Sequence, residues 1–213
     1  MNIHVTEAHH TRQPRVEDAA LITGVGRFVD DTAMQGQAYA AFVRSPHAFA
    51  RIRSIDFGEA HETPGIVAVL TAADMMHEAI DSLARHPPMD GRNGSTLVRP
   101  ARPALADERV VHVGQAIAMV VARSRNVALD VAEMIAVDYE PLAPAVELAQ
   151  AEAPGTPQIW PEAKDNVALS WCLPSEEEKI AQVKATLGHA AHVARVKVVN
   201  QRLVVASMET RGA

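Results

Sequence analysis

Residues 110–144, VVHVGQAIAMVVARSRNVALDVAEMIAVDYEPLAP, hold the pattern that decides the fold. The apolar run at 116–122 predicts a strand, and Ser124 stands where the N-cap of a helix belongs. Apolar residues then recur at helical spacing: Val127, Val131, Met134 and Ile135. A short β-type run follows at 136–139. We therefore expect strand, helix and strand, with a crossover long enough for the two strands to be parallel neighbours in a right-handed connection.

Further β-type segments lie N-terminal to this unit. The stretches 37–44, 50–56 and 66–70 each predict a strand that could join the same sheet. Thr71 is a candidate cap for a helix through Ile80, with Asp74 in its first turn, where the helix dipole favours a carboxylate. The proline-rich stretch 86–104 predicts a long loop, and loops of this length in compact domains are usually functional or mobile.

The C-terminal third alternates between loop, strand and helix signals. We expect a short strand at 167–172, a helix from Ser175 to about Leu187, and a long strand at 192–200 that continues in extended form at 203–206. An unpaired strand with this much apolar surface is an aggregation liability. We therefore predict that another polypeptide completes the segment from residue 196 onward.

Composition restricts the classes of partner. The chain has 213 residues, 48% hydrophobic and 22% charged, as in ordinary globular proteins, and a formal net charge of −6. This charge argues against a broad nucleic-acid surface. With one cysteine, an internal disulfide is impossible and a cysteine-based metal cluster within the chain is excluded. No apolar run approaches the roughly 20 residues of a membrane span, and we expect a cytoplasmic location.

The residues supply no self-contained reaction centre. No metal-ligand spacing, nucleophile elbow or phosphate-binding loop is present in the sequence, so we assign no catalytic and no metal-binding residue. Cys172 lies in an apolar run, which favours a buried structural thiol over a nucleophile. Gly24 and Gly26 are interpreted as turn residues, because no long helical pattern follows them. From the residues alone, the chain is an α/β or α+β module.

Six phrases, taken together and in order, resemble the molybdenum-binding large subunits of the xanthine dehydrogenase and aerobic carbon monoxide dehydrogenase family. They are RVEDAALITGVGRFVDD (15–31), FVRSPHAFARI (42–52), PGIVAVLTAADM (64–75), VGQAIAMVVARS (113–124), AEMIAVDYEPLAP (132–144) and VNQRLVVASMETRGA (199–213). The resemblance spans nearly the whole chain. It implies an α+β fold, with a mixed sheet and packed helices of the a/b hammerhead type, followed by the start of a molybdopterin-binding domain.

The resemblance also divides the chain. It implies an extended N-terminal arm at 1–20, the hammerhead domain at 21–150, and a linker with the first elements of the molybdopterin-binding region at 151–213. Family large subunits are several times longer, and their glycine-rich loops and catalytic glutamate lie beyond the matching part. We accordingly expect one piece of a split large subunit, a truncated gene product or an expressed fragment, inactive by itself.

Site residues carry over only where the motifs match. Gln201 corresponds to the family glutamine that approaches the apical oxygen of the molybdenum, where an amide can donate a hydrogen bond without adding charge. Glu209 and Arg211 match a signature that we interpret as an ion pair or backbone clamp. Arg44, Ser45, Pro46 and His47 form a second signature, interpreted as structural: proline sets the turn and serine bonds the local backbone.

The implied activity belongs to a complex. A molybdenum hydroxylase hydroxylates or oxidises a small substrate with oxygen derived from water, using molybdenum in molybdopterin cytosine dinucleotide. The resemblance implies that the remaining molybdopterin-binding polypeptide holds most of this cofactor, and that a small subunit with 2Fe-2S clusters and a medium subunit with FAD accept the electrons. The alternative, from the residues, is a non-catalytic scaffold or interaction module that docks other subunits.

Overall fold

The computed structural model describes residues 15–80, 82, 87–171, 176–200, 207 and 209. The strands are β1 Tyr39–Arg44, β2 Ala50–Asp56, β3 Ile66–Thr71, β4 Arg109–Val110, β5 Ala116–Ala122 and β6 Ala136–Pro141. The α-helices are α1 Asp18–Ile22, α2 Ala72–His77, α3 Arg125–Met134 and α4 Glu176–His189. Short 3-10 turns occupy Val29–Asp31, Arg92–Gly94, Leu148–Gln150 and Lys164–Asn166. The chain divides into two units, Ala38–Arg195 and a second made of Met1–Gln37 with Val196–Ala213.

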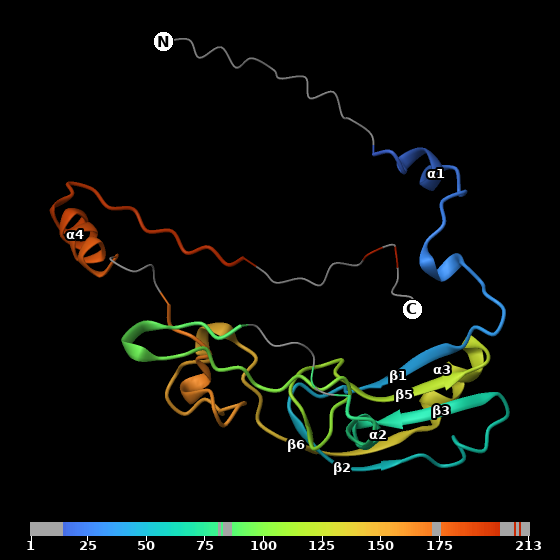
Figure 1. Cartoon of the computed structure of the whole chain (residues 1–213). Helices are drawn as coiled ribbons and strands as arrows, with labels where there is room; N and C mark the ends of the chain where they lie inside the picture. The colour runs from blue at the N-terminus through green and yellow to red at the C-terminus, as the bar shows by residue number, and fades with distance from the viewer. Residues whose placement is uncertain are drawn as a thin grey trace. The chain divides into compact units, whose positions relative to one another are not determined.

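The strands form two small antiparallel sheets rather than one (Figure 1). In the first sheet β5 lies between β1 and β3, and in the second β2 lies between β4 and β6. The α+β class is therefore confirmed. The expectation that β5 and β6 are parallel neighbours is wrong, because β6 pairs with β2 from Asp56–Ala136 to Ala50–Pro141. Periodicity identifies a strand but not its partner, and here the partner is distant in sequence.

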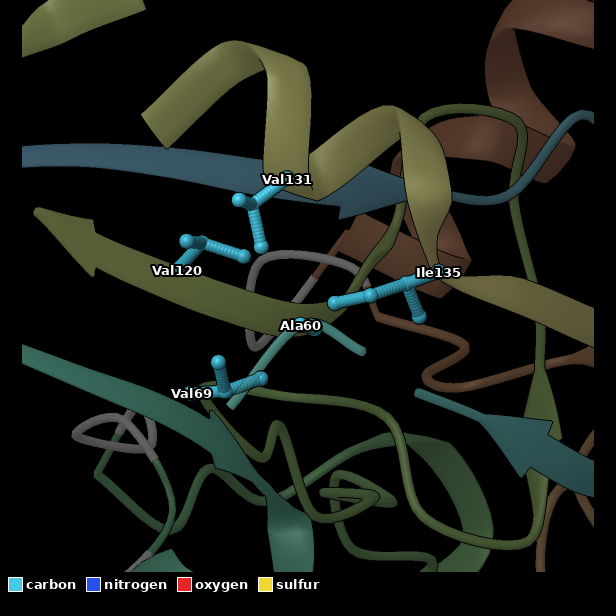
Figure 2. Close-up of a cluster of buried hydrophobic side chains, with 5 residues drawn as sticks. All are labelled: Ala60, Val69, Val120, Val131 and Ile135. Atoms are coloured by element: carbon cyan, nitrogen blue, oxygen red, sulfur yellow. The ribbon is translucent and has the colours of Figure 1, made fainter. Parts of the chain in front are cut away.

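Helix α3 covers one face of the first sheet and forms the main core with it. Val131 is fully buried and faces Val120 of β5, with Val69 of β3 and Ile135 alongside (Figure 2). The cap is confirmed, because the Ser124 hydroxyl accepts a hydrogen bond from the Val127 amide at 3.3 Å.

The predicted buried face of the helix is wrong at one residue. Met134 is 46% exposed, because it is the last residue of α3 and the chain leaves the helix at Ile135. Ala128, not predicted to be buried, is covered instead and packs with Ala41 and Ala122. These are small side chains, which let helix and sheet approach closely.

A second buried cluster joins the two sheets. Ile117 of β5 packs with Ala50 of β2, Val110 of β4 and Ala106. The amide of Ala106 donates to the carbonyl of Ala116 at 2.8 Å, which closes the edge of this cluster. The junction between the sheets is thus buried and hydrogen-bonded, so the turns that enter it are held in place.

Several predicted ends and strands differ from the structure. α2 ends at His77 rather than Ile80, since Ala79 adopts a positive φ of 55°. α1 begins inside the stretch predicted as extended. Over 167–171 and 192–200 the described residues form no strand, and Val198 is exposed. A strand needs a hydrogen-bonded neighbour, which alternation alone does not supply. The helix predicted near 175–187 is confirmed as α4.

The predicted loop at 86–104 is described from residue 87. It folds back on itself through a bridge between Asp90 and Thr96. It is also held by the segment 168–170, since the amides of Arg92 and Val98 donate to the carbonyls of Ser170 and Ala168 at 2.8 and 2.9 Å. The loop is therefore anchored to the C-terminal half of its own unit.

Candidate functional site

The turn between β1 and β2, at the junction of the sheets, holds a buried polar network. Ser45, 2% exposed, is its centre. Its amide donates to the carbonyl of Gln115 at 2.9 Å, and its carbonyl accepts from the amide of Gly114 at 2.8 Å. Its hydroxyl accepts from the amide of His47 at 2.9 Å and lies 3.1 Å from the carbonyl of His47. The predicted local bond of this serine is therefore present, and its buried polar groups are satisfied.

Arg44 closes the rim of the turn. Its Nη1 donates to the carbonyl of Gly114 at 2.9 Å, and its guanidinium carbon lies 5.2 Å from the centroid of the Phe42 ring. Both contacts fix a long, exposed side chain in one position, and the ring face attracts the cation. The positive charge at this edge of the sheet is therefore preorganised.

His47 and Tyr139 connect the turn to β6. Their rings meet edge-to-face, with centroids 4.8 Å apart and planes inclined by 62°. Burial raises the pKa of the Tyr139 phenol above its usual value, and a hydrogen bond with the Ser45 side chain opposes this rise. The phenol is neutral at physiological pH, so it acts here as a packing and hydrogen-bonding group.

The chemistry of this arrangement is that of a joint, not of a reaction centre. The Ser45 hydroxyl and the backbone groups of Ser45 are used internally, and no nucleophile is paired with a base within the turn. Across the part of the chain that the structure describes, no three His, Cys, Asp or Glu side chains gather closely enough to hold a metal ion. On the neighbouring surface Glu140 forms salt bridges with Arg51 and Arg53, each with an N···O distance of 3.5 Å, and these pairs are weak because their side chains are largely exposed.

Two residues of this joint escaped the sequence prediction. Gly114 has a φ of 82°, a conformation that favours glycine, and its carbonyl and amide both serve the turn. The side chain of Gln115 accepts from the amide of Val111 at 2.7 Å, which holds the entry to β5. The adjacent Gly-Gln pair was a usable signal, since a glycine just before a buried strand marks a turn.

Most of the other predicted site residues fall outside the part of the chain that the structure describes. Gln201, Arg211 and Cys172 lie outside the described residues. Glu209 is described and exposed. The roles predicted for Gln201, Glu209 and Arg211 therefore stay predictions. In the described part of the chain, no helix combines the length and apolarity needed to cross a bilayer.

Comparison with known proteins agrees with the fold. Residues 23–143 match the family described as aldehyde oxidase and xanthine dehydrogenase, a/b hammerhead domain. The carbon monoxide dehydrogenase large chain of Afipia carboxidovorans is 40% identical over 156 residues, which are 73% of this chain and 18% of that protein. The nicotine 6-hydroxylase large subunit of Paenarthrobacter nicotinovorans is 33% identical over 201 residues, 94% of this chain and 23% of that subunit.

A solved structure shows the same relationship. Reconstituted carbon monoxide dehydrogenase from Oligotropha carboxidovorans superposes with a TM-score of 0.53 at 41% identity, over 68% of this chain and 17% of that one. The chain thus spans less than a quarter of the length of these relatives. The family match covers more than half of the chain and includes both sheets and α3. The chain therefore belongs to the xanthine dehydrogenase and aldehyde oxidase family of molybdenum hydroxylase large subunits, and carries its a/b hammerhead domain.

Proposed function

We propose that this chain is the hammerhead part of a molybdenum hydroxylase large subunit, working in a cytoplasmic complex. The complex would insert oxygen from water into a C–H bond of a heterocycle or an aldehyde, or oxidise carbon monoxide. Electrons would pass to a subunit with 2Fe-2S clusters and then to one with FAD. The observation that carries the proposal is the family match across residues 23–143, the part of the chain that forms both sheets and α3.

Within this complex the chain's own contribution is structural. The polar groups of the Ser45 turn are used internally, and the described residues offer no ligand cluster for a metal. They therefore do not fit a molybdenum cofactor by themselves. We assign molybdopterin cytosine dinucleotide mainly to the remaining large-subunit polypeptide. From this chain we retain only the Gln201 amide as a candidate hydrogen-bond donor near the cofactor.

A second function, a non-catalytic module that docks other subunits, is compatible with the described residues, among which no acids, bases and nucleophiles converge. The two functions differ in the composition of the native complex. Purification of that complex should yield molybdenum and a cytidine-nucleotide pterin at stoichiometric amounts if the first proposal holds. A complex without either would support the docking module.

The isolated chain provides the complementary test. Alone, it should not oxidise aldehydes or purines with a dye acceptor. Turnover by isolated chain that is free of other subunits would contradict the structural role. In the loaded complex, Gln201→Ala should lower kcat, whereas Gln182→Ala, on the exposed surface of α4, should leave it unchanged.

A further inference from the structure

The first sheet has a second face, opposite α3, that is apolar across all three strands. Residues directly opposite each other in a ladder point to the same side of the sheet. The registers of β1 and β3 on β5 therefore place six residues on this face in two rows: Phe42, Met119 and Leu70 in one, and Ala40, Val121 and Ala68 in the other. We call these six residues the outer face.

The outer face is not part of the described core. None of the three buried clusters includes any of its residues, whereas the alternate residues Ala41, Val120 and Val69 are buried under α3. Phe42 is 43% exposed. Ala40 is also exposed, whereas Ala68, Leu70, Met119 and Val121 are half-buried. The two rows therefore form a contiguous apolar surface that is open along β1 and partly covered over β5 and β3, and exposed apolar surface of this kind marks interaction sites.

A fixed positive charge borders this patch. Arg44 follows Phe42 on β1, its guanidinium lies over the phenyl ring, and one of its nitrogens is bonded to the carbonyl of Gly114. A guanidinium has five N–H donors in a rigid fork, so donors remain for a carboxylate. The partner that fits this surface therefore has apolar side chains for the two rows and a carboxylate at the Arg44 end.

We propose that the outer face docks an apolar segment, bearing a carboxylate opposite Arg44, from the remaining polypeptide of the same large subunit. This inference rests on the proposed function. The 201 residues matched in the nicotine 6-hydroxylase subunit are 23% of it, so such a subunit has about three times as much further chain available to cover this face. Docking within one subunit also avoids most of the entropic cost of bringing free partners together.

A second copy of this chain fits the surface less well. A two-fold interface pairs a patch with itself, so it would bring the Arg44 charges to the rims of both rows. The two rows contain no acidic residue that could pair with them. Like charges at a desolvated rim are unfavourable, which disfavours self-association through this face.

The test is a graft. The 213-residue chain, with Cys172→Ser, replaces the matched 201-residue segment of the nicotine 6-hydroxylase large subunit. Phe42→Cys reports on the outer face. Leu129→Cys is the matched control, since Leu129 is 51% exposed on α3 and belongs to none of the buried clusters. Maleimide labelling at each site, resolved by peptide mass spectrometry, is compared between the graft and the isolated chain.

Docking predicts that labelling at position 42 slows about tenfold or more in the graft, while position 129 changes by less than about twofold. A graft that binds molybdenum but labels freely at position 42 overturns the docking site and leaves the proposed function intact. A graft protected at position 42 but devoid of molybdenum supports the docking site and counts against the function.

If the graft does not accumulate, the isolated chain decides. A concentration-dependent dimer that Phe42→Ser abolishes and Leu129→Ser preserves would assign the outer face to a second copy and overturn the proposal. A monomer whose binding of an apolar dye is lost with Phe42→Ser, and kept with Leu129→Ser, supports an outer face that is open for a different chain.

Discussion

Replacement of Val131 by aspartate tests whether α3 packs on the first sheet as described. Val131 is fully buried among Val120, Val69, Ala60 and Ile135 (Figure 2). The substitution removes the burial of a valine side chain, about 1.5–3 kcal/mol, and places a carboxyl group in a site without a hydrogen-bond partner. We expect a loss of about 4–6 kcal/mol, a large part of the 5–15 kcal/mol typical of a folded domain.

The assay is thermal and urea unfolding of the full 213-residue chain, followed by circular dichroism. For a chain of this size each 1 kcal/mol lowers Tm by about 2–4 °C, so Val131→Asp should lower it by roughly 10–20 °C or prevent folding. Because the buried carboxyl group prefers its neutral form, the loss should be smaller in mild acid than at neutral pH. Val131→Ala should cost about 2 kcal/mol.

The matched control is Leu129→Asp on the exposed side of the same helix. It introduces the same aspartate into α3 at an exposed position outside the core. We expect it to change the free energy of unfolding by less than about 0.5 kcal/mol. If Val131→Asp and Leu129→Asp unfold at the same temperature as the unmodified chain, α3 does not bury Val131 against the sheet and the packing argument fails.

Substitutions at three further residues test local structure. Ser124→Ala should destabilise by about 1 kcal/mol, because the Val127 amide loses its cap, and Ser124→Asp should restore most of it in urea unfolding; equal midpoints for all three chains would refute the cap. The pKa of Asp74 is lowered by hydrogen bonds from the backbone and side chain of Thr71, the N-cap residue of α2, so the Asp74 carboxylate takes up a proton more readily in the unfolded chain. The stability that the Asp74 carboxylate contributes is present above the usual aspartate pKa and is lost as pH falls through its lower pKa in the folded chain. Asp74→Asn should therefore flatten the dependence of unfolding free energy on pH in this range. An unchanged dependence would contradict the role of Asp74. Asn166 bonds three backbone groups of its loop through one side chain, so Asn166→Ala should cost about 2–3 kcal/mol and speed amide exchange at Ile159. Asn166→Gly, which tolerates the φ of 58°, separates the hydrogen bonds from the backbone conformation and should still lose the protection of that amide.

The sequence anticipated the local elements of the hammerhead domain well. Their signals lie within a few residues of each other: the alternation of β2, the apolar run of β5, the cap at Ser124 and the 3.6-residue period of α3. The turn at Ser45 was predictable for the same reason. Its proline, Pro46, and the bond from the His47 amide to the Ser45 hydroxyl involve residues that are adjacent in sequence. The structural interpretation of this motif needed no knowledge of the rest of the fold.

Pairing could not be anticipated in this way. The partner of β6 is β2, more than eighty residues earlier, and the pattern of β6 contains nothing that distinguishes β2 from β5. Likewise, the exposure of Met134 follows from the direction in which the chain leaves α3. The prediction of a strand at 192–200 was wrong because alternation indicates which residues would share a face of a strand, and does not show that a neighbouring strand is present.

By itself, then, the sequence determined where strands, helix caps and turns begin, because short-range sterics and hydrogen bonds select them. It also determined the family, through phrases spread along the chain in a shared order. Tertiary structure alone decided that the strands form two antiparallel sheets, that Gly114 and Gln115 lock the Ser45 turn, and that Phe42 belongs to an apolar face bordered by Arg44. These features depend on side chains far apart in sequence meeting in space, and burial rewards such meetings only once the whole fold has formed.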